Sequence, residues 1–371
     1  MFSPVAGDGD NVLTGWQNSW GGGIRTAKLG WSWTSDDEKV GMLADFCYDN
    51  LGVFGAGDWA AGWWQPADWV KLSVGHIDAT GGELRSDVCY GSWDWIRPNY
   101  WVQGDEGITF NAGGVDGLRV QLFPVEGLQI MAQLGLPLSS DNKFYTKGVD
   151  VKDYTDDEKK DDFDKYVITA EDKHSVTTYD KAYRLYGNGS VAVGYTIADI
   201  GTIKAAFLGN YDGDKGTYGK VNVAFDLTAI ENMFLTVGVR IPVEDKISEG
   251  EQVVLPSLGF SYQILDNFKI ALTASADIKK SKDPAISAGI GIGYGLTDTL
   301  GLTADFRYLG DLEADKSYIS FLVGLDYNFA SNGKLGIGFQ GFTEGKGFVA
   351  GFEGKGDEFC WAVPIMFQIA F

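Results

Sequence analysis

The chain has 371 residues, a formal net charge of −21, 51 glycines and 14% aromatic residues. The negative charge argues against a nucleic-acid partner, because phosphates need a basic surface. Its 3 cysteines and 2 histidines offer neither a disulfide scaffold nor the spacing of a metal site, so we expect no metal and no cofactor. No apolar run reaches the roughly 18 residues of a transmembrane helix. Frequent glycine and aromatic residues are instead typical of short strands and tight turns in one all-β domain over 1–371.

The first part of the chain begins with an ambiguous stretch and continues with two alternating strands. Residues 9–20 are either an initial strand or a lead-in. Met1-Phe2-Ser3-Pro4 lacks the basic start and apolar core of a signal peptide, so we expect that an exported form has lost its signal. Residues 24–33 and 39–48 then place large apolar groups at every second position, as a strand with two different faces does.

Tryptophans gather around the next predicted turn, at 65–68. Indole rings prefer the headgroup level of a membrane, where the ring is half buried and its N–H stays hydrated. We therefore predict an aromatic girdle here, with ordinary core tryptophans as the alternative. Together with the C-terminal aromatic residue, the predicted girdle comprises Trp59, Trp63, Trp64, Trp69 and Phe371.

Residues 79–106 interrupt the strand pattern with glycines, both charge signs and three further tryptophans. A solvated loop has no need of so many tryptophans, so we expect this loop to pack against another part of the protein. Strands resume over 108–123 and 128–137. Residues 138–185 are rich in charge and poor in apolar groups, which predicts one long external loop.

From residue 186 onward, alternating strands are joined by turns of two length classes. Short turns are predicted at 198–201, 229–232, 265–267, 297–299 and 331–333, and longer connections near 211–217, 244–251, 279–284, 310–316 and 343–357. Short turns on one side and longer loops on the other are typical of up-and-down outer-membrane barrels.

The last thirteen residues form one amphipathic ribbon. Phe359, Trp361, Ile365, Phe367 and Phe371 share one face with other large apolar residues, and the opposite face is smaller and more polar. In a bilayer such an apolar face contacts lipid, and a closed barrel satisfies the backbone hydrogen bonds. A buried strand of a soluble sandwich is the alternative.

These features together resemble bacterial porins, the β-barrel channels of the outer membrane. The resemblance implies a transmembrane antiparallel up-and-down barrel with short periplasmic turns and longer external loops. It also implies assembly by the barrel-assembly machinery through the C-terminal strand, and it allows a homotrimer. Seventeen candidate strands can be counted, and single-chain barrels have even numbers. Either 9–20 adds an eighteenth strand, which we prefer, or one early run is a loop and the number is sixteen.

In porins a loop at about the place of 79–106 folds into the barrel and narrows it. The resemblance therefore makes its charged residues candidates for a pore constriction. With five carboxylates against two guanidiniums, this constriction would favour cations weakly. The candidates are Glu83, Arg85, Asp87, Asp94, Arg97, Asp105 and Glu106.

The expected function is passive diffusion of ions and small hydrophilic solutes through the outer membrane, without enzymatic activity. No motif marks His76 or His174 as catalytic, although a site built from spatial neighbours stays open. The alternatives are an adhesin or structural barrel that acts through the charged loop, and a soluble all-β protein. Cys47 and Cys360 are predicted near the external ends of strands beside the barrel seam, where an oxidising envelope would permit a disulfide.

Overall fold

Most of the strand-rich part of the chain is described by the structure, a computed structural model. No helix in these residues is long and apolar enough to cross a membrane. The structure describes residues 2–4, 14–16, 25–49, 54–77, 84–88, 108–135, 167–168, 174–175, 188–212, 216–243, 247–312, 315–343, 359–363 and 365–369.

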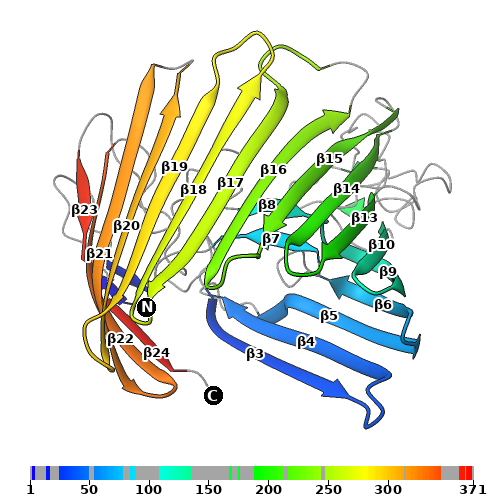
Figure 1. The fold of residues 1–371 in the computed structure, drawn as a ribbon, viewed down its shortest axis with the longest axis horizontal. Coiled ribbons are helices and arrows are strands. Elements are labelled where there is room, and N and C mark those ends of the chain that lie inside the picture. The colour runs from blue at the N-terminus through cyan, green and yellow to red at the C-terminus, as the bar shows by residue number, and fades with distance from the viewer. Residues whose placement is uncertain are drawn as a thin grey trace, which may run out of the picture.

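Sixteen strands form a continuous antiparallel meander, in which each strand pairs with the next one (Figure 1). The expected all-β, up-and-down arrangement is confirmed. The strands are β3 (Arg25–Thr34), β4 (Val40–Asp49), β5 (Phe54–Ala67), β6 (Val70–Ile77), β9 (Val115–Val125), β10 (Leu128–Gly135), β13 (Asn188–Ile197), β14 (Gly201–Asp212), β15 (Gly216–Leu227), β16 (Met233–Val243), β17 (Gln252–Leu265), β18 (Phe268–Lys279), β19 (Ala285–Gly295), β20 (Leu300–Asp311), β21 (Lys316–Ala330) and β22 (Gly333–Phe342).

The two ends of the chain meet at the β22 edge. The C-terminal ribbon forms β23 (Cys360–Ala362) and β24 (Ile365–Ile369), both paired with β22. β24 also pairs with β1 (Phe2–Pro4), which pairs with β2 (Thr14–Trp16). The stretch 9–20 thus contributes a three-residue strand beside β1. Among the residues that the structure describes, no backbone pairing joins β3 to β1, β2 or β24.

The sheet has two chemically different faces. On β20, Thr303, Asp305 and Arg307 are buried on one face, and Phe306 is exposed on the other. The same alternation recurs from strand to strand, with exposed fractions of 56% at Val191 and 51% at Ile337. We call the face with exposed large apolar side chains the outer face and the opposite, polar face the inner face.

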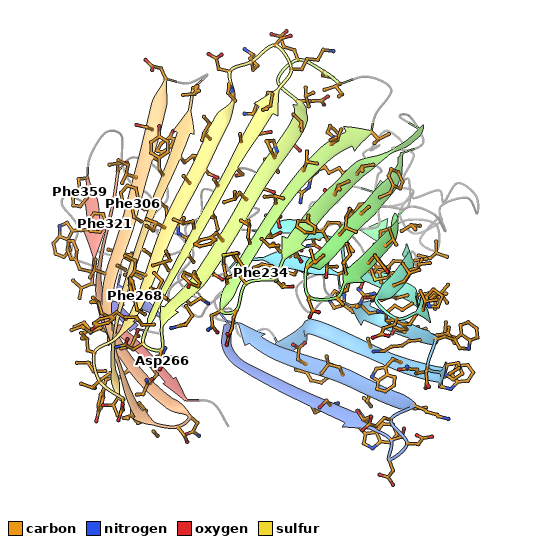
Figure 2. All side chains as sticks on the ribbon, in the orientation of Figure 1. Phe234, Asp266, Phe268, Phe306, Phe321 and Phe359 are labelled. Atoms are coloured by element: carbon orange, nitrogen blue, oxygen red, sulfur yellow. The ribbon has the colours of Figure 1, made fainter. Side chains whose placement is uncertain are left out.

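The C-terminal ribbon continues the outer face, as its alternation predicts. Directly paired residues share a face, and Ile365 lies opposite Ile337. The rings of Phe339 and Trp361 stack with their centroids 6.0 Å apart. Figure 2 shows labelled aromatic side chains on this flank of the sheet, among them Phe306, Phe321 and Phe359.

Two features differ from the sequence-based expectations. The connection expected over 211–217 is only 213–215, because strand pairing continues through the polar residues as far as Asp212 and Gly216. The run 108–123 is not one strand, because it divides into β8 (Ile108–Asn111) and β9. Gly113 has a φ of +83°, and its N–H donates to Oδ1 of Asn111 over 2.7 Å, which turns the chain out of the main sheet.

Two small ladders lie outside the main sheet. β7 (Arg85–Asp87) pairs with β8, and β11 (Val167–Ile168) pairs with β12 (His174–Ser175) inside the predicted charged loop. The other residues of 138–185 lie outside the described part of the chain, so their external position stays a prediction.

The β3–β4 turn is stabilised by a carboxylate. The hydroxyl of Ser35 donates to Oδ1 of Asp37 over 2.6 Å, and the N–H of Lys39 donates to the same oxygen. These two bonds lower the pKa of Asp37 below its ordinary value of 3.8. The fold favours the ionised form, so this contribution to stability is present above the ordinary pKa and is lost as the pH falls through the lowered one.

Candidate functional site

The β7–β8 pair lies against the inner face of the main sheet, behind β15 and β16 in Figure 1. Glycines of the wall allow this approach. A Cβ on Gly238 would lie 2.2 Å from the backbone oxygen of Thr109, and one on Gly194 would lie 2.3 Å from the side chain of Leu84. A side chain at Gly238 would therefore displace the backbone of β8, whereas one at Gly194 would only require Leu84 to rotate.

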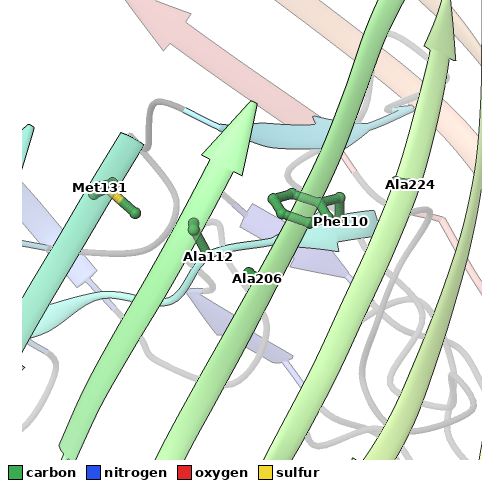
Figure 3. Close-up of a cluster of buried hydrophobic side chains, with 6 residues drawn as sticks. Phe110, Ala112, Met131, Ala206 and Ala224 are labelled. Carbon is green, nitrogen blue, oxygen red and sulfur yellow. The ribbon is translucent and has the colours of Figure 1, made fainter. Parts of the chain in front are cut away.

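An apolar cluster fills the space between the β7–β8 pair and the wall (Figure 3). Phe110 of β8 is fully buried, and the wall residues beneath it are mostly alanines. Small wall residues leave room for one large ring, which is how alternating residue sizes fill a core. The buried members of the cluster are Phe110, Ala112, Met131, Ala192, Ala206 and Ala224.

A buried ion pair joins the same segment to β14 and β15. Nζ of Lys204 donates to Oδ2 of Asp226 over 2.6 Å, to Oγ of Ser86 over 2.7 Å and to the backbone oxygen of Arg85 over 2.8 Å. The hydroxyl of Ser86 also donates to Asp226 over 2.8 Å. The two charged side chains are only 8% and 7% exposed, so each compensates the other's buried charge.

Neutral hydrogen bonds add further anchors. The hydroxyls of Thr109 and Thr236 lie 2.5 Å apart, and the amide of Asn222 donates to the backbone oxygen of Asn111 over 3.0 Å. Gln133 of β10 donates to the backbone oxygens of Ala112 and Gly113 over 3.0 and 3.1 Å. The segment around β7 and β8 is therefore fixed to β10 and to β13–β16 by both apolar and polar contacts.

Ionic groups continue along the inner face away from the β7–β8 pair. Arg307 donates to both carboxylate oxygens of Asp305 over 2.7 Å, and Thr303 donates to Asp326 over 3.0 Å. On β18, two strands closer to the β7–β8 pair, Nζ of Lys279 lies 3.9 Å from Asp277. The alternation within β18 and β20 predicts that their ionisable residues share one face opposite the apolar residues, but it does not predict which of them pair. Such a surface suits a hydrated path better than a dry core.

The constriction candidates fall largely outside the described residues. Arg85 and Asp87 belong to β7, and the side chain of Asp87 is not described. Glu83, Asp94, Arg97, Asp105 and Glu106 lie outside the described residues. Their place in a pore therefore stays a proposal.

The girdle candidates lie on different faces. Trp64 and Trp69 are 51% and 59% exposed. Trp63 lies on the inner face, because strand neighbours alternate, and its ring covers Gly41 and lies 4.8 Å from Nζ of Lys71. The side chain of Trp59 and all of Phe371 lie outside the described residues, as do the side chains of Cys47 and Cys360. The disulfide stays a prediction, which non-reducing mass spectrometry can check.

One polar pair lies on the outer face. Nδ1 of His76 lies 2.5 Å from Oδ1 of Asp116, and the two side chains are 41% and 36% exposed. The described residues contain no group of three or more His, Cys, Asp or Glu side chains placed to hold a metal ion.

Comparisons with known proteins find solved structures only at low similarity. No family model matches the chain, and no curated protein matches it. Among solved structures, an anion-selective porin from Comamonas acidovorans is 11% identical with a TM-score of 0.45, covering 95% of this chain and 91% of that one. OmpT, an outer membrane protein of Vibrio cholerae in a trimer form, is 12% identical with a TM-score of 0.42, covering 99% and 96%. An engineered Rh. blastica porin is 12% identical with a TM-score of 0.45, covering 93% and 89%.

Proposed function

We propose that this chain is a bacterial outer-membrane β-barrel channel for passive diffusion of ions and small hydrophilic solutes. The observation that carries the proposal is the division of one curved sheet into an exposed apolar face and a polar face. Large contiguous apolar surfaces are rare on soluble monomers, whereas an outward apolar band is what lipid requires of a barrel. Closure of the sheet beside β24 and β1 completes the barrel in this proposal.

The lumen in this proposal is narrowed but not filled. A barrel of about sixteen strands is too wide for its own side chains to fill, so water occupies the interior. The β7–β8 pair takes up part of that space on one wall. Because β7 and β8 flank residues 88–107, this placement supports 79–106 as the constriction.

Bilayer conductance tests the proposed function. Protein refolded in detergent and added to a planar bilayer should give stepwise, voltage-independent conductance that scales with salt concentration. An inserted protein without conductance would favour the adhesin or structural barrel. A protein that stays monodisperse without detergent would favour the soluble all-β alternative.

Weak cation selectivity is the finer part of the proposal. Changing Asp87, Asp94, Asp105 and Glu106 to their amides should shift the reversal potential in a salt gradient toward anions. The shift should shrink at high salt, because the screening length is about 10 Å at 0.1 M and about 3 Å at 1 M.

The control for this variant carries the same change of charge elsewhere. Asp199, Glu231, Asp266 and Asp298 lie in exposed turns, and their amide variant should move the reversal potential much less. Equal shifts in the two variants would show that 79–106 is not the filter.

A further inference from the structure

One part of the inner face exposes an apolar side chain, although this face is otherwise polar. Leu43 of β4 pairs with Ser32 of β3 and with Ala61 of β5, and its side chain is 38% exposed. The other exposed large apolar side chains that the structure describes lie on the outer face, at strand ends or outside the strands. Leu43 is therefore an exception within the inner face.

The indole of Trp63 lies beside Leu43. Gly41 and Leu43 are consecutive inner-face positions of β4, and Gly41 pairs with Trp63 of β5. A Cβ on Gly41 would lie 2.5 Å from Cε2 and Cζ2 of the indole and 2.6 Å from its Nε1. The ring therefore leans over β4, along the wall, and its free side is turned toward the lumen. The indole and the isobutyl group of Leu43 together form one apolar surface.

Polar groups border this surface on both sides. Ser32 and Thr34 of β3 are exposed inner-face residues, and Thr34 pairs with Gly41. On the side of β6, Nζ of Lys71 lies 4.8 Å from the centroid of the Trp63 ring, within the range of a cation–π contact. We call Ser32, Thr34, Leu43, Trp63 and Lys71 the β3–β6 platform.

The local charge on this wall is positive. Among the described side chains on the inner face of β3–β9, the ionisable ones are Lys71 and Arg119 against Asp45, whereas the whole chain carries a net charge of −21. Arg119 and Asp45 are buried, and Lys71 is partly exposed. An ammonium has three donors, so Lys71 can contact the indole and several acceptors at once. A solute with an anionic group is therefore complementary to this platform.

A small aromatic carboxylate matches both parts of the platform. Solute sites combine a mostly apolar lining with a few polar groups that fix the orientation of the solute. An aryl ring would lie on the indole and the isobutyl group, where offset ring stacking is favourable, and its carboxylate would accept from Nζ of Lys71. A neutral sugar would not compensate the local positive charge, and a short aliphatic acid would leave the apolar surface in water.

We propose that the β3–β6 platform is a binding site for small aromatic carboxylates on the channel wall. The proposal rests on the channel function proposed above and names a solute class for it. The platform lies close to the short turns that follow β3 and β5, away from the β7–β8 pair, which contacts β10 and β13–β16. It therefore prolongs the residence of one solute class at a place separate from the constriction.

Equilibrium dialysis of the folded protein in detergent tests the solute class, with protein-free micelles as the blank. Labelled benzoate should bind saturably with a dissociation constant on the order of 1 mM, as expected for a ligand of its size. Acetate lacks the ring and benzamide lacks the charge, so each should bind about threefold or more weakly. Binding of acetate or benzamide as tight as that of benzoate would overturn the assignment of the solute class.

Matched pairs of substitutions test the location. Trp63→Ala removes the indole of the platform, and Trp64→Ala removes its neighbour on the outer face, which is 51% exposed. Lys71→Met and Lys269→Met each remove a lysine at the second position of a strand that follows a short turn, but Lys269 lies on β18. Trp63→Ala should weaken benzoate binding about tenfold and Lys71→Met about threefold, whereas the two control variants should bind benzoate as the unchanged protein does.

Leu43→Ser provides a second change within the platform, in case Trp63→Ala folds poorly. It should weaken the binding of benzoate and leave that of acetate unchanged. Equal benzoate binding in Trp63→Ala, Leu43→Ser and Trp64→Ala would overturn the site while conductance in potassium chloride persists. Absence of conductance in the unchanged protein would overturn the channel proposal, and with it the place of this site on a permeation path.

Discussion

Replacing Gly238 with valine should lower the single-channel conductance and destabilise the fold. A Cβ there would lie 2.2 Å from the backbone oxygen of Thr109, a contact that a side-chain rotation cannot relieve. β8 must therefore move, and since the wall is behind it, it moves toward the lumen. Overpacking of this kind costs about 1–3 kcal/mol, and displacement of Phe110 from its cluster adds to the cost.

Gly293→Val is the matched control for this change. Gly293 also lies on the inner face, on β19, and a Cβ there meets nothing within 4 Å. Denaturant unfolding in vesicles and single-channel recording compare the two variants directly. If Gly238→Val and Gly293→Val conduct and unfold alike, β8 is not held against this wall in the membrane.

Removing one partner of the Lys204–Asp226 pair should have the largest effect on stability. Asp226→Leu leaves the buried ammonium of Lys204 without its carboxylate. Lys204→Met leaves the buried carboxylate of Asp226 without its ammonium. Breaking a buried pair from one side costs about 3–5 kcal/mol, whereas replacing both partners by apolar groups is often close to neutral. The double variant Lys204→Met/Asp226→Leu should therefore be more stable than either single variant.

A more exposed ion pair provides the comparison. Nζ of Lys279 lies 3.9 Å from Asp277, and the two side chains are 28% and 6% exposed, so the coupling energy between them should be only about 0–1 kcal/mol. The free energy of unfolding of all six variants, measured in urea, gives two double-mutant cycles. Additive losses at Lys204 and Asp226 would mean that the pair does not act as a unit.

The strands could be predicted because their alternation is local. The outer-face residues Phe268, Ile270 and Leu272 and the inner-face residues Lys269 and Thr273 follow a period of two, which needs no knowledge of neighbours. The C-terminal ribbon was predicted for the same reason.

The site was predicted less completely because it is built from distant residues. Ser86 and Asp226 are 140 residues apart, and no sequence pattern links them. The separation of β8 from β9 depends on the positive φ of Gly113. The two consecutive glycines, Gly113 and Gly114, are the signal in the sequence that could have predicted this break. The position of Asp116 on the outer face follows from the register of β9 against β6. The turn between β8 and β9 interrupts the alternation, so the sequence does not reveal this register.

A cysteine scan along β18 tests the central claim most directly, namely that one face of this sheet contacts water and the other contacts lipid. Cysteines replacing Lys269 and Ser275 on the inner face should react with a charged thiol reagent and reduce the single-channel current. Cysteines replacing Ile270, Leu272 and Ala274 should leave the current unchanged and carry fluorophores that brominated lipid quenches. Reactivity and quenching that do not alternate with a period of two would contradict the account.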